Sequence, residues 1–365
     1  MFSGRRLGLA RRRRGLSKKG FAEVLGVHPR TVLRWEDGDR LPDEREAARV
    51  ADALGFPPEF FVGPDIDEPT AGAASFRSLS AMPARDRDAA LAAGALGFLL
   101  GDWVEARFNL PDHDLPDLSL ETPDGAARVL RERWGIGERP VSNMVHLLEA
   151  KGVRVFSMAE NTRTVDAFST WRRERAYVFL NSQKSAERQR FDAAHELGHL
   201  VLHKHGGPHG REAEDEAQRF ASAFLMPEAD VLAAIPVVRD LPQLVAAKRR
   251  WKVSVAALNT RLHRLGLTTE WQYRTLAVQI QERGYRTAEP EGIARETSAV
   301  WGKVFDALRA EGTTKMRIAE DLALPVAEVE NLVFGLAHML TIEGGGAHAA
   351  PRAGGGAHLR LVSGR

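Results

Sequence analysis

The sequence predicts a mainly α-helical protein that contains one small α+β core. Apolar residues recur at helical spacing through residues 5–61 and again through residues 229–340. Two short runs, Val153–Ser157 and Ala176–Asn181, interrupt this helical pattern and are expected to be strands. An apolar helix follows the second strand. The expected fold is therefore an all-α N-terminal bundle, a small α+β core and a helical C-terminal region.

Composition is that of a globular protein, with 44% hydrophobic and 27% charged residues. No apolar run reaches the roughly 18–20 residues that span a bilayer, and the basic N-terminus lacks the apolar stretch of a secretory signal. We therefore expect a cytoplasmic protein without membrane contact. The absence of cysteine excludes disulfides, thiolate nucleophiles and Cys-ligated zinc. Any metal site must use histidine and carboxylate ligands.

Five segments are expected along the chain. A linker rich in proline and glycine follows the N-terminal helices, and a long helix is predicted over residues 84–109. Glycine, alanine and histidine dominate the C-terminal tail, which is expected to be disordered. The N-terminal domain, the linker with its helical connector, the α+β core, the helical C-terminal region and the tail span residues 1–65, 66–120, 121–270, 271–343 and 344–365.

The N-terminal domain is strongly basic. Residues 1–41 hold 11 Lys and Arg against 4 Asp and Glu, a net charge of +7. Such a charge indicates contact with a polyanion such as nucleic acid, and a solvated basic arm is the alternative. Ser17 is placed to cap a helix, Gly26 to end it, and Pro29 to start a short second helix. The second helix is cationic outside and apolar inside, as a recognition helix is.

The string GLSKKGFAEVLGVHPRTVLRWEDGDRLP resembles the Xre/Cro/C1-type helix-turn-helix family. The resemblance implies a double-stranded DNA operator as partner and a homodimer on paired half-sites. It places Lys18 at a phosphate, although glutamine is common there, and it places Arg30 and Arg34 against bases or backbone. The expected DNA-binding residues are Lys18, Lys19, His28, Pro29, Arg30, Thr31 and Arg34. A helix-turn-helix used only for protein contacts is the alternative.

The α+β core carries a metal-binding pattern on the helix after its second strand. The sequence HELGH places His195 and His199 four residues apart, on one helix face. Glu196 lies beside the first histidine, where a carboxylate can take a proton from a water molecule that the metal activates. Gly198 allows another segment to approach this apolar helix closely. The context favours a zinc-dependent peptidase over a helix with incidental histidines.

Zinc requires a third protein ligand, and spacing alone does not identify it. A helical carboxylate downstream of the second histidine suits a site with two histidines and one glutamate. Four acidic side chains stand close together in that region, namely Glu212, Glu214, Asp215 and Glu216.

The segments FDAAHELGHLVLH and EDEAQRFASAFLMP resemble the ImmA/IrrE metallopeptidase family, with further similarity at ASFRSLS (74–80) and RLHRLGL (261–267). The resemblance implies Zn²⁺ as cofactor and a regulatory protein as substrate. It also implies Glu214 as the third zinc ligand, with Glu216 as the alternative, and an Xre-type domain is a known companion of this peptidase. His203 is interpreted as a structural or rim residue rather than a ligand.

No residue is identified as a stabiliser of a developing oxyanion. Tyr177 and His209 are candidates, and an ordinary structural role is favoured for each. The strand before the helix, 176–181, is a candidate edge for pairing with an extended substrate.

Two later segments repeat the rhythm of a helix-turn-helix. Helices are predicted over Leu241–Trp251 and Ser254–Leu265, and their basic residues are interpreted as a solvated face rather than a DNA contact. These residues are Lys248, Arg249, Arg250, Lys252, Arg261 and Arg264. Residues 313–334 repeat the rhythm but are acidic, and they are predicted to be a packing or dimer element.

Together these patterns predict a DNA-binding transcriptional regulator with a zinc metalloendopeptidase domain. Cleavage of a repressor or another regulatory protein, as in a stress response, is the expected activity. The alternatives are a regulator whose peptidase fold senses a ligand or partner without proteolysis, and an antitoxin-like module that neutralises a partner.

Overall fold

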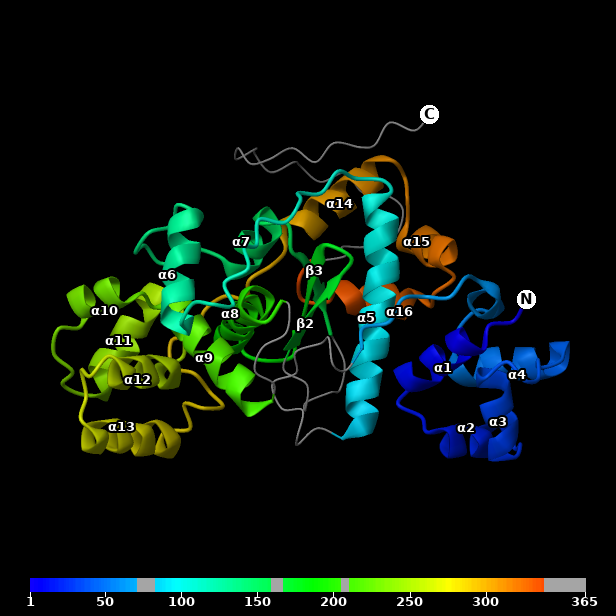
Figure 1. Cartoon of the computed structure of the whole chain (residues 1–365), viewed down its shortest axis with the longest axis horizontal. Coiled ribbons are helices and arrows are strands. Elements are labelled where there is room, and N and C mark those ends of the chain that lie inside the picture. The colour runs from blue at the N-terminus through cyan, green and yellow to red at the C-terminus, as the bar shows by residue number, and fades with distance from the viewer. Residues whose placement is uncertain (71–82, 159–166, 205–209, 338–365) are drawn as a thin grey trace.

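The computed structural model describes residues 1–70, 83–158, 167–204 and 210–337. It is mainly α-helical with a small three-stranded sheet, which confirms the predicted fold class. Figure 1 shows the N-terminal helices at one end, the sheet beside the long helix α5 (Ala84–Glu105) in the middle, and helices α10 to α13 at the other end. The expected tail and the ASFRSLS segment lie outside the described residues.

The N-terminal domain is a bundle of short helices. They are α1 (Gly4–Arg13), α2 (Lys18–Leu25), α3 (Pro29–Glu36), α4 (Glu44–Leu54) and the 3₁₀ helix η1 (Pro58–Val62). The predicted boundaries hold, because the Ser17 side chain accepts a hydrogen bond from the backbone N–H of Gly20 and Gly26 ends α2 with a φ of 64°. Val32 and Trp35 of α3 are buried in the bundle core, so the opposite face of α3 is presented outward.

The sheet has the order β1–β3–β2. β1 (Arg154–Ser157) is parallel to β3 (Arg175–Leu180), and β2 (Ala167–Arg172) is antiparallel to it. β1 and β3 match the two predicted strands, whereas β2 has no counterpart in the sequence analysis. Its central residues Ser169 and Thr170 are polar and hide the β pattern, yet each is only 2% exposed because helices cover both faces of the sheet.

Two helices sandwich this sheet. α5 lies against the aromatic face, where a Cβ on Gly97 would stand 2.5 Å from the Phe179 ring, so glycine is required for this close approach. α8 (Ala186–Leu202) packs on the other face, where the Trp171 indole N–H donates to the Leu200 carbonyl at 3.3 Å. The helix predicted within the connector is therefore one layer of the core.

The remaining helices of the core extend away from the sheet. They are α6 (Pro123–Arg133), α7 (Met144–Ala150), α9 (Arg211–Leu225), α10 (Glu228–Ala234), α11 (Leu241–Trp251), α12 (Val255–Arg264) and α13 (Glu270–Glu282). α9 packs along α8 and α6, and this contact brings the first turn of α9 next to the zinc-motif helix. Within the described part of the chain, none of the helices combines the length and hydrophobicity that crossing a bilayer requires.

Buried carboxylates tie the C-terminal helices to the core. Glu149 of α7 accepts hydrogen bonds from the backbone N–H groups at the start of α14 (Ala299–Ala310), at 2.9 and 3.2 Å. In return, Glu296 accepts from the backbone N–H groups at the start of α7, at 2.7 and 3.3 Å. Glu296 also pairs with the fully buried Arg190 of α8. The unpaired backbone N–H groups at the start of α7 and of α14 are thus each satisfied by a carboxylate from the other segment.

The last two helices, α15 (Lys315–Leu322) and α16 (Val326–Val333), return to the middle of the molecule. α16 packs on α5 and β1. Its Glu328 is 1% exposed and binds two arginines at the end of α1, with Oε2 at 2.7 Å from Arg13 and Oε1 at 2.5 Å from the C-cap residue Arg14. Because Arg13 is also buried, this ion pair joins the N-terminal domain to the C-terminal end of the core.

Candidate metal centre and nucleic-acid interface

The HELGH motif lies on α8, and helical spacing directs its two histidines to the same side. Nε2 of His195 and Nε2 of His199 are 3.1 Å apart. Their side chains are 2% and 6% exposed, so contacts with surrounding residues fix the orientation of both rings. The apolar neighbours of the motif, among them Leu197 and Val201, are buried and anchor this helix in the core.

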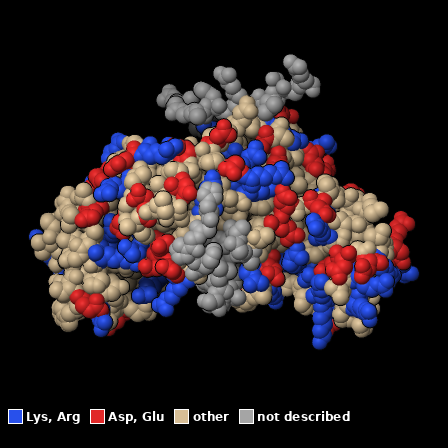
Figure 2. Space-filling view, viewed as in Figure 1, with Lys and Arg blue, Asp and Glu red and all other residues tan. Residues whose placement is uncertain are grey.

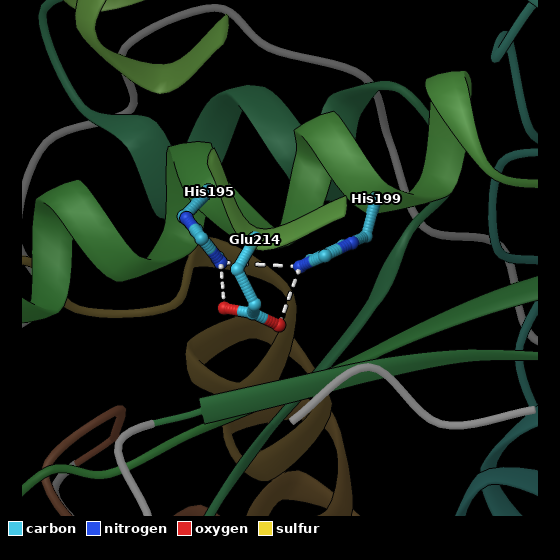
Figure 3. A group of neighbouring side chains, drawn as sticks. All are labelled: His195, His199 and Glu214. Atoms are coloured by element: carbon cyan, nitrogen blue, oxygen red, sulfur yellow. Dashed lines mark hydrogen bonds and ion pairs between the residues drawn. The ribbon is translucent and has the colours of Figure 1, made fainter. Parts of the chain in front are cut away.

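α9 supplies the third group. The Glu214 carboxylate lies 3.3 Å from Nε2 of His195 and 3.4 Å from Nε2 of His199, and Figure 3 shows the three side chains converging. Gly198 permits this arrangement, because a Cβ there would lie 3.0 Å from the Phe220 ring and 3.2 Å from the Cα of Ala217 on α9. The close approach expected at Gly198 is therefore made by the helix that carries the glutamate.

The three donor atoms fit a zinc ion. Bonds of about 2.0–2.1 Å in a tetrahedral site place neighbouring ligand atoms about 3.3 Å apart, which is the spacing of the His195, His199 and Glu214 atoms. Burial raises the pKa of Glu214, but hydrogen bonds and charge interactions with the two histidines outweigh it and lower the pKa to about 2. The glutamate is thus ionised at neutral pH, as a metal ligand must be.

Glu196 follows His195 on α8 and is positioned by β2, the strand that the sequence patterns did not predict. The carboxylate is almost fully buried, and the Ser169 hydroxyl of β2 donates to its Oε2 at 2.7 Å. The side chain of Ser169 therefore points to the α8 face of the sheet. An alternation of residue types through Ala167–Arg172 is the only sequence signal for this role, and it is weak because both central residues are polar.

Glu216 does not join the group of three donors. Its Oε2 lies 2.9 Å from Nε2 of His203, and Nδ1 of His203 lies 3.0 Å from Nδ1 of His199. Burial lowers the pKa of His203 more than its contact with Glu216 raises it, which favours the neutral ring. The two glutamates that spacing left open thus make different contacts, one with both histidines of the motif and one with His203.

The position of Tyr177 agrees with the structural role favoured for it, whereas the free strand edge expected for substrate pairing requires correction. Tyr177 is fully buried among aromatic rings on the α5 face of β3, whereas Ser169 and the metal centre lie on the α8 face. The strand before α8 is β3, which is paired on both sides by β1 and β2, so it has no free edge for a substrate. Burial and apolar content made β3 visible in the sequence, and central strands share both properties. His209 lies outside the described residues.

The predicted DNA-binding residues form the outer face of α2 and α3. Pro29, Arg30 and Arg34 are exposed, and Thr31 is half-buried. Figure 2 shows Lys and Arg side chains projecting from the lower edge of this domain, where Figure 1 places α2 and α3. His28 is exposed and caps α3, because its Nδ1 accepts from the backbone N–H of Arg30 at 3.2 Å.

The two lysines of α2 differ in their surroundings. Lys18 pairs with Glu36 at 3.4 Å, and Glu36 is also held by Arg11 at 2.6 Å. The Lys19 side chain is 80% exposed and lies 4.0 Å from Glu23. Lys19 is therefore the more accessible of the two lysines for a phosphate. The charge of Lys18 is already partly offset by its ion pair with Glu36.

The second basic segment, on α11 and α12, is engaged within the protein. Lys248 and Arg261 are buried and pair with Glu289 at 3.3 Å and with Asp124 at 2.7 Å, so these two do not belong to a solvated face. The other four also have partners, since Arg249, Arg250 and Arg264 pair with acidic side chains and Lys252 donates to the Ser142 carbonyl. Arg249, Arg250 and Arg264 remain exposed, as predicted for a solvated face, and their acidic partners offset their positive charge.

Comparison with known protein families assigns both functional regions. Residues 4–60 match the family model of a helix-turn-helix domain, and residues 148–263 match that of the IrrE N-terminal-like domain, peptidase M78. The second match includes the HELGH helix and α9, and the first includes α2 and α3. A search of curated proteins finds no match. The chain therefore contains a region that matches helix-turn-helix domains, which are typical of DNA-binding regulators, and a second region that matches the IrrE N-terminal-like domain of peptidase M78.

Proposed function

We propose that this protein is a DNA-binding transcriptional regulator whose zinc centre cleaves a repressor or another regulatory protein. The observation that carries the proposal is the convergence of His195, His199 and Glu214 around one point, with Glu196 held beside them by Ser169. A structural zinc site is closed by four protein ligands. Three ligands with a neighbouring carboxylate favour a catalytic site that keeps one position open.

A zinc ion held by these ligands supplies a Lewis acid for the scissile carbonyl and lowers the pKa of water. Glu196 is the general base: it takes the proton of the attacking water and then gives it to the leaving amine. The Ser169 hydroxyl donates to Oε2 of Glu196 at 2.7 Å, and this hydrogen bond orients the carboxylate for the transfer. His195, His199 and Glu214 orient the metal and take no part in proton transfer.

DNA binding is proposed for the outer face of α3, with Arg30 and Arg34 as the main contacts to an operator. Lys19 and Lys18 are proposed to bind the phosphate backbone, and a dimer would place two such helices on paired half-sites. A chain that is bound to DNA through one domain acts near the regulators that share its operators. The proposal therefore implies a narrow regulatory cleavage in the cytoplasm rather than general proteolysis.

The proposal is tested by Glu196→Gln, a nearly isosteric change that removes the base but leaves every metal ligand. After purification and reconstitution with zinc, wild type and variant should each contain one zinc ion per chain. Cleavage of a co-expressed regulatory protein should fall by at least about 100-fold in the variant, because general base catalysis contributes roughly that much.

The matched control is Glu212→Gln, which makes the same change of charge at an exposed position of α9. It should retain both zinc and cleavage. A wild type that binds no stoichiometric zinc overturns the metal centre. Stoichiometric zinc with equal cleavage in wild type and Glu196→Gln overturns the role of Glu196. Zinc-loaded wild type that releases operator DNA on meeting a partner, with the partner left intact, favours the sensor function instead.

A further inference from the structure

A line of polar contacts runs from His199 through His203 to Glu216. His203 lies one helical turn beyond His199, at the C-terminal end of α8, and Glu216 lies opposite it on α9. Nδ1 of His199 is 3.0 Å from Nδ1 of His203, and Nε2 of His203 is 2.9 Å from Oε2 of Glu216. The side chains are 6%, 11% and 33% exposed in that order, so the line runs from the interior to the surface.

The positions of the protons along this line follow from the role of His199. A histidine that binds a metal through Nε2 has its ring proton on Nδ1. Nδ1 of His199 therefore donates, and Nδ1 of His203 accepts. An imidazole that accepts at Nδ1 has its own proton on Nε2, and from this atom His203 donates to the Glu216 carboxylate at 2.9 Å.

The reverse arrangement is incompatible with metal binding. If Nδ1 of His203 donated, Nδ1 of His199 would be the acceptor and its ring proton would stand on Nε2. That proton would point at the Nε2 atom of His195 and at the Glu214 carboxylate, where the metal belongs. Glu216 disfavours this arrangement, because its carboxylate oxygen, 2.9 Å from Nε2 of His203, accepts a hydrogen bond and so needs an N–H on that atom.

We propose that Glu216 and His203 are positioning residues that hold His199 in the one tautomer able to bind the metal. This inference rests on the proposed zinc centre. It adds an outer pair of residues behind the ligand His199, one at the end of α8 and one on α9. α9 contributes Glu214 directly, and it contributes Glu216 through His203. An outer carboxylate or histidine of this kind changes metal affinity by about 10- to 100-fold in proteins.

The test measures zinc affinity by competition with a chromophoric chelator, a readout that does not depend on catalysis. His203→Leu should weaken zinc binding roughly 10- to 100-fold, because the ring acceptor is lost. His203→Gln should lose much less, because the amide oxygen can accept from His199 and the amide nitrogen can donate to Glu216. Glu216→Gln should fall between them, since an amide can accept the same hydrogen bond without fixing its direction.

A second readout is the tautomer itself. Long-range ¹⁵N–¹H NMR spectra of the zinc-loaded wild type should show the His199 proton on Nδ1 and the His203 proton on Nε2. Glu212→Gln serves as the control for charge and should retain wild-type affinity. Circular dichroism of the metal-free variants shows whether each is folded, and the comparison of His203→Gln with Glu216→Gln remains decisive if His203→Leu unfolds.

The outcomes separate this inference from the proposed function. Stoichiometric zinc with wild-type affinity in His203→Leu and Glu216→Gln overturns the positioning chain and leaves the metal centre intact. A His203 proton on Nδ1 in the NMR spectrum overturns it as well. If the wild type itself binds no zinc, the proposed function fails first.

Discussion

The pairs α2–α3 and α15–α16 have the same local design and opposite surroundings. In each pair a Ser or Thr side chain caps a first helix of eight residues, a left-handed residue ends it, and a second helix of eight residues follows three residues later. The left-handed residue is Gly26 in one pair and Ala323 in the other, with φ of 64° and 52°. α3 turns an exposed cationic face to solvent, whereas α16 is packed under α5 and β1.

The difference shows what a local rhythm determines and what it leaves open. Caps and turn residues fix where the helices begin and end, because these groups act within one or two turns. The outward residues decide the partner. Arg30 and Arg34 keep α3 in solvent, whereas Val329 and Leu332 of α16 are buried, and Glu328 is satisfied by two arginines of the N-terminal domain. The second pair is therefore a docking element for the first domain.

The largest expected effect comes from breaking that docking. Glu328→Ala leaves Arg13 buried without its carboxylate, and loss of one partner of a buried ion pair costs about 3–5 kcal/mol in the free energy of unfolding. Urea denaturation at pH 7 measures this change. Glu330→Ala, on the same helix but with a half-exposed partner in Lys315, should cost less than about 1 kcal/mol. Equal effects in the two variants contradict the docking role of α16.

The next effect concerns the exposed face of α3. Arg30→Ala combined with Arg34→Ala should weaken operator binding by at least about 10-fold, because each arginine contact to a base contributes roughly 1–3 kcal/mol. The free energy of unfolding should change by less than about 0.5 kcal/mol, since both side chains are exposed. A mobility-shift titration at fixed salt measures the affinity. Arg317→Ala, an exposed change on α15, is the control and should bind DNA as the wild type does.

The smallest effect tests the shared design itself. Ser17→Ala and Thr314→Ala each remove a side chain that caps a helix, and each should cost about 1 kcal/mol in the free energy of unfolding. Ser17→Gly and Thr314→Gly should cost only a few tenths of a kcal/mol, because glycine is tolerated at this position. If the alanine variant lowers the free energy of unfolding in one pair and leaves it unchanged in the other, the two pairs differ in local structure as well as in their surroundings.

Sequence patterns predicted most of the helices and the placement of the two motif histidines, His195 and His199, on one helix face. Helix caps depend only on neighbouring residues, and so does the helix face that two residues share. The sequence therefore predicted the caps at Ser17 and Ser254 and the common face of His195 and His199. The choice of Glu214 over Glu216 came from resemblance, and the distances in the structure favour Glu214.

Other features depended on contacts between segments far apart in the sequence. The sequence patterns did not predict β2, because its central residues Ser169 and Thr170 are polar although buried, and Ser169, the partner of Glu196, was missed with it. The free edge expected before α8 was wrong because β3 is the central strand, and strand order is set by tertiary packing. The pairing of Glu328 with Arg13 joins residues 315 positions apart, a distance that no local pattern spans.

The contact between Gly198 and α9 also bears on metal selectivity. Glu214 is fixed to α9, and α9 rests directly on the backbone of α8, so the distance from the glutamate to the two histidines is set by the packing of two helices. An ion such as Ca²⁺ takes six to eight ligands at about 2.3–2.6 Å. Two of the three donors here are imidazole nitrogens, which suit Zn²⁺, whereas Ca²⁺ binds oxygen ligands. The donor set that the packing of α9 against α8 brings together thus favours Zn²⁺ over Ca²⁺.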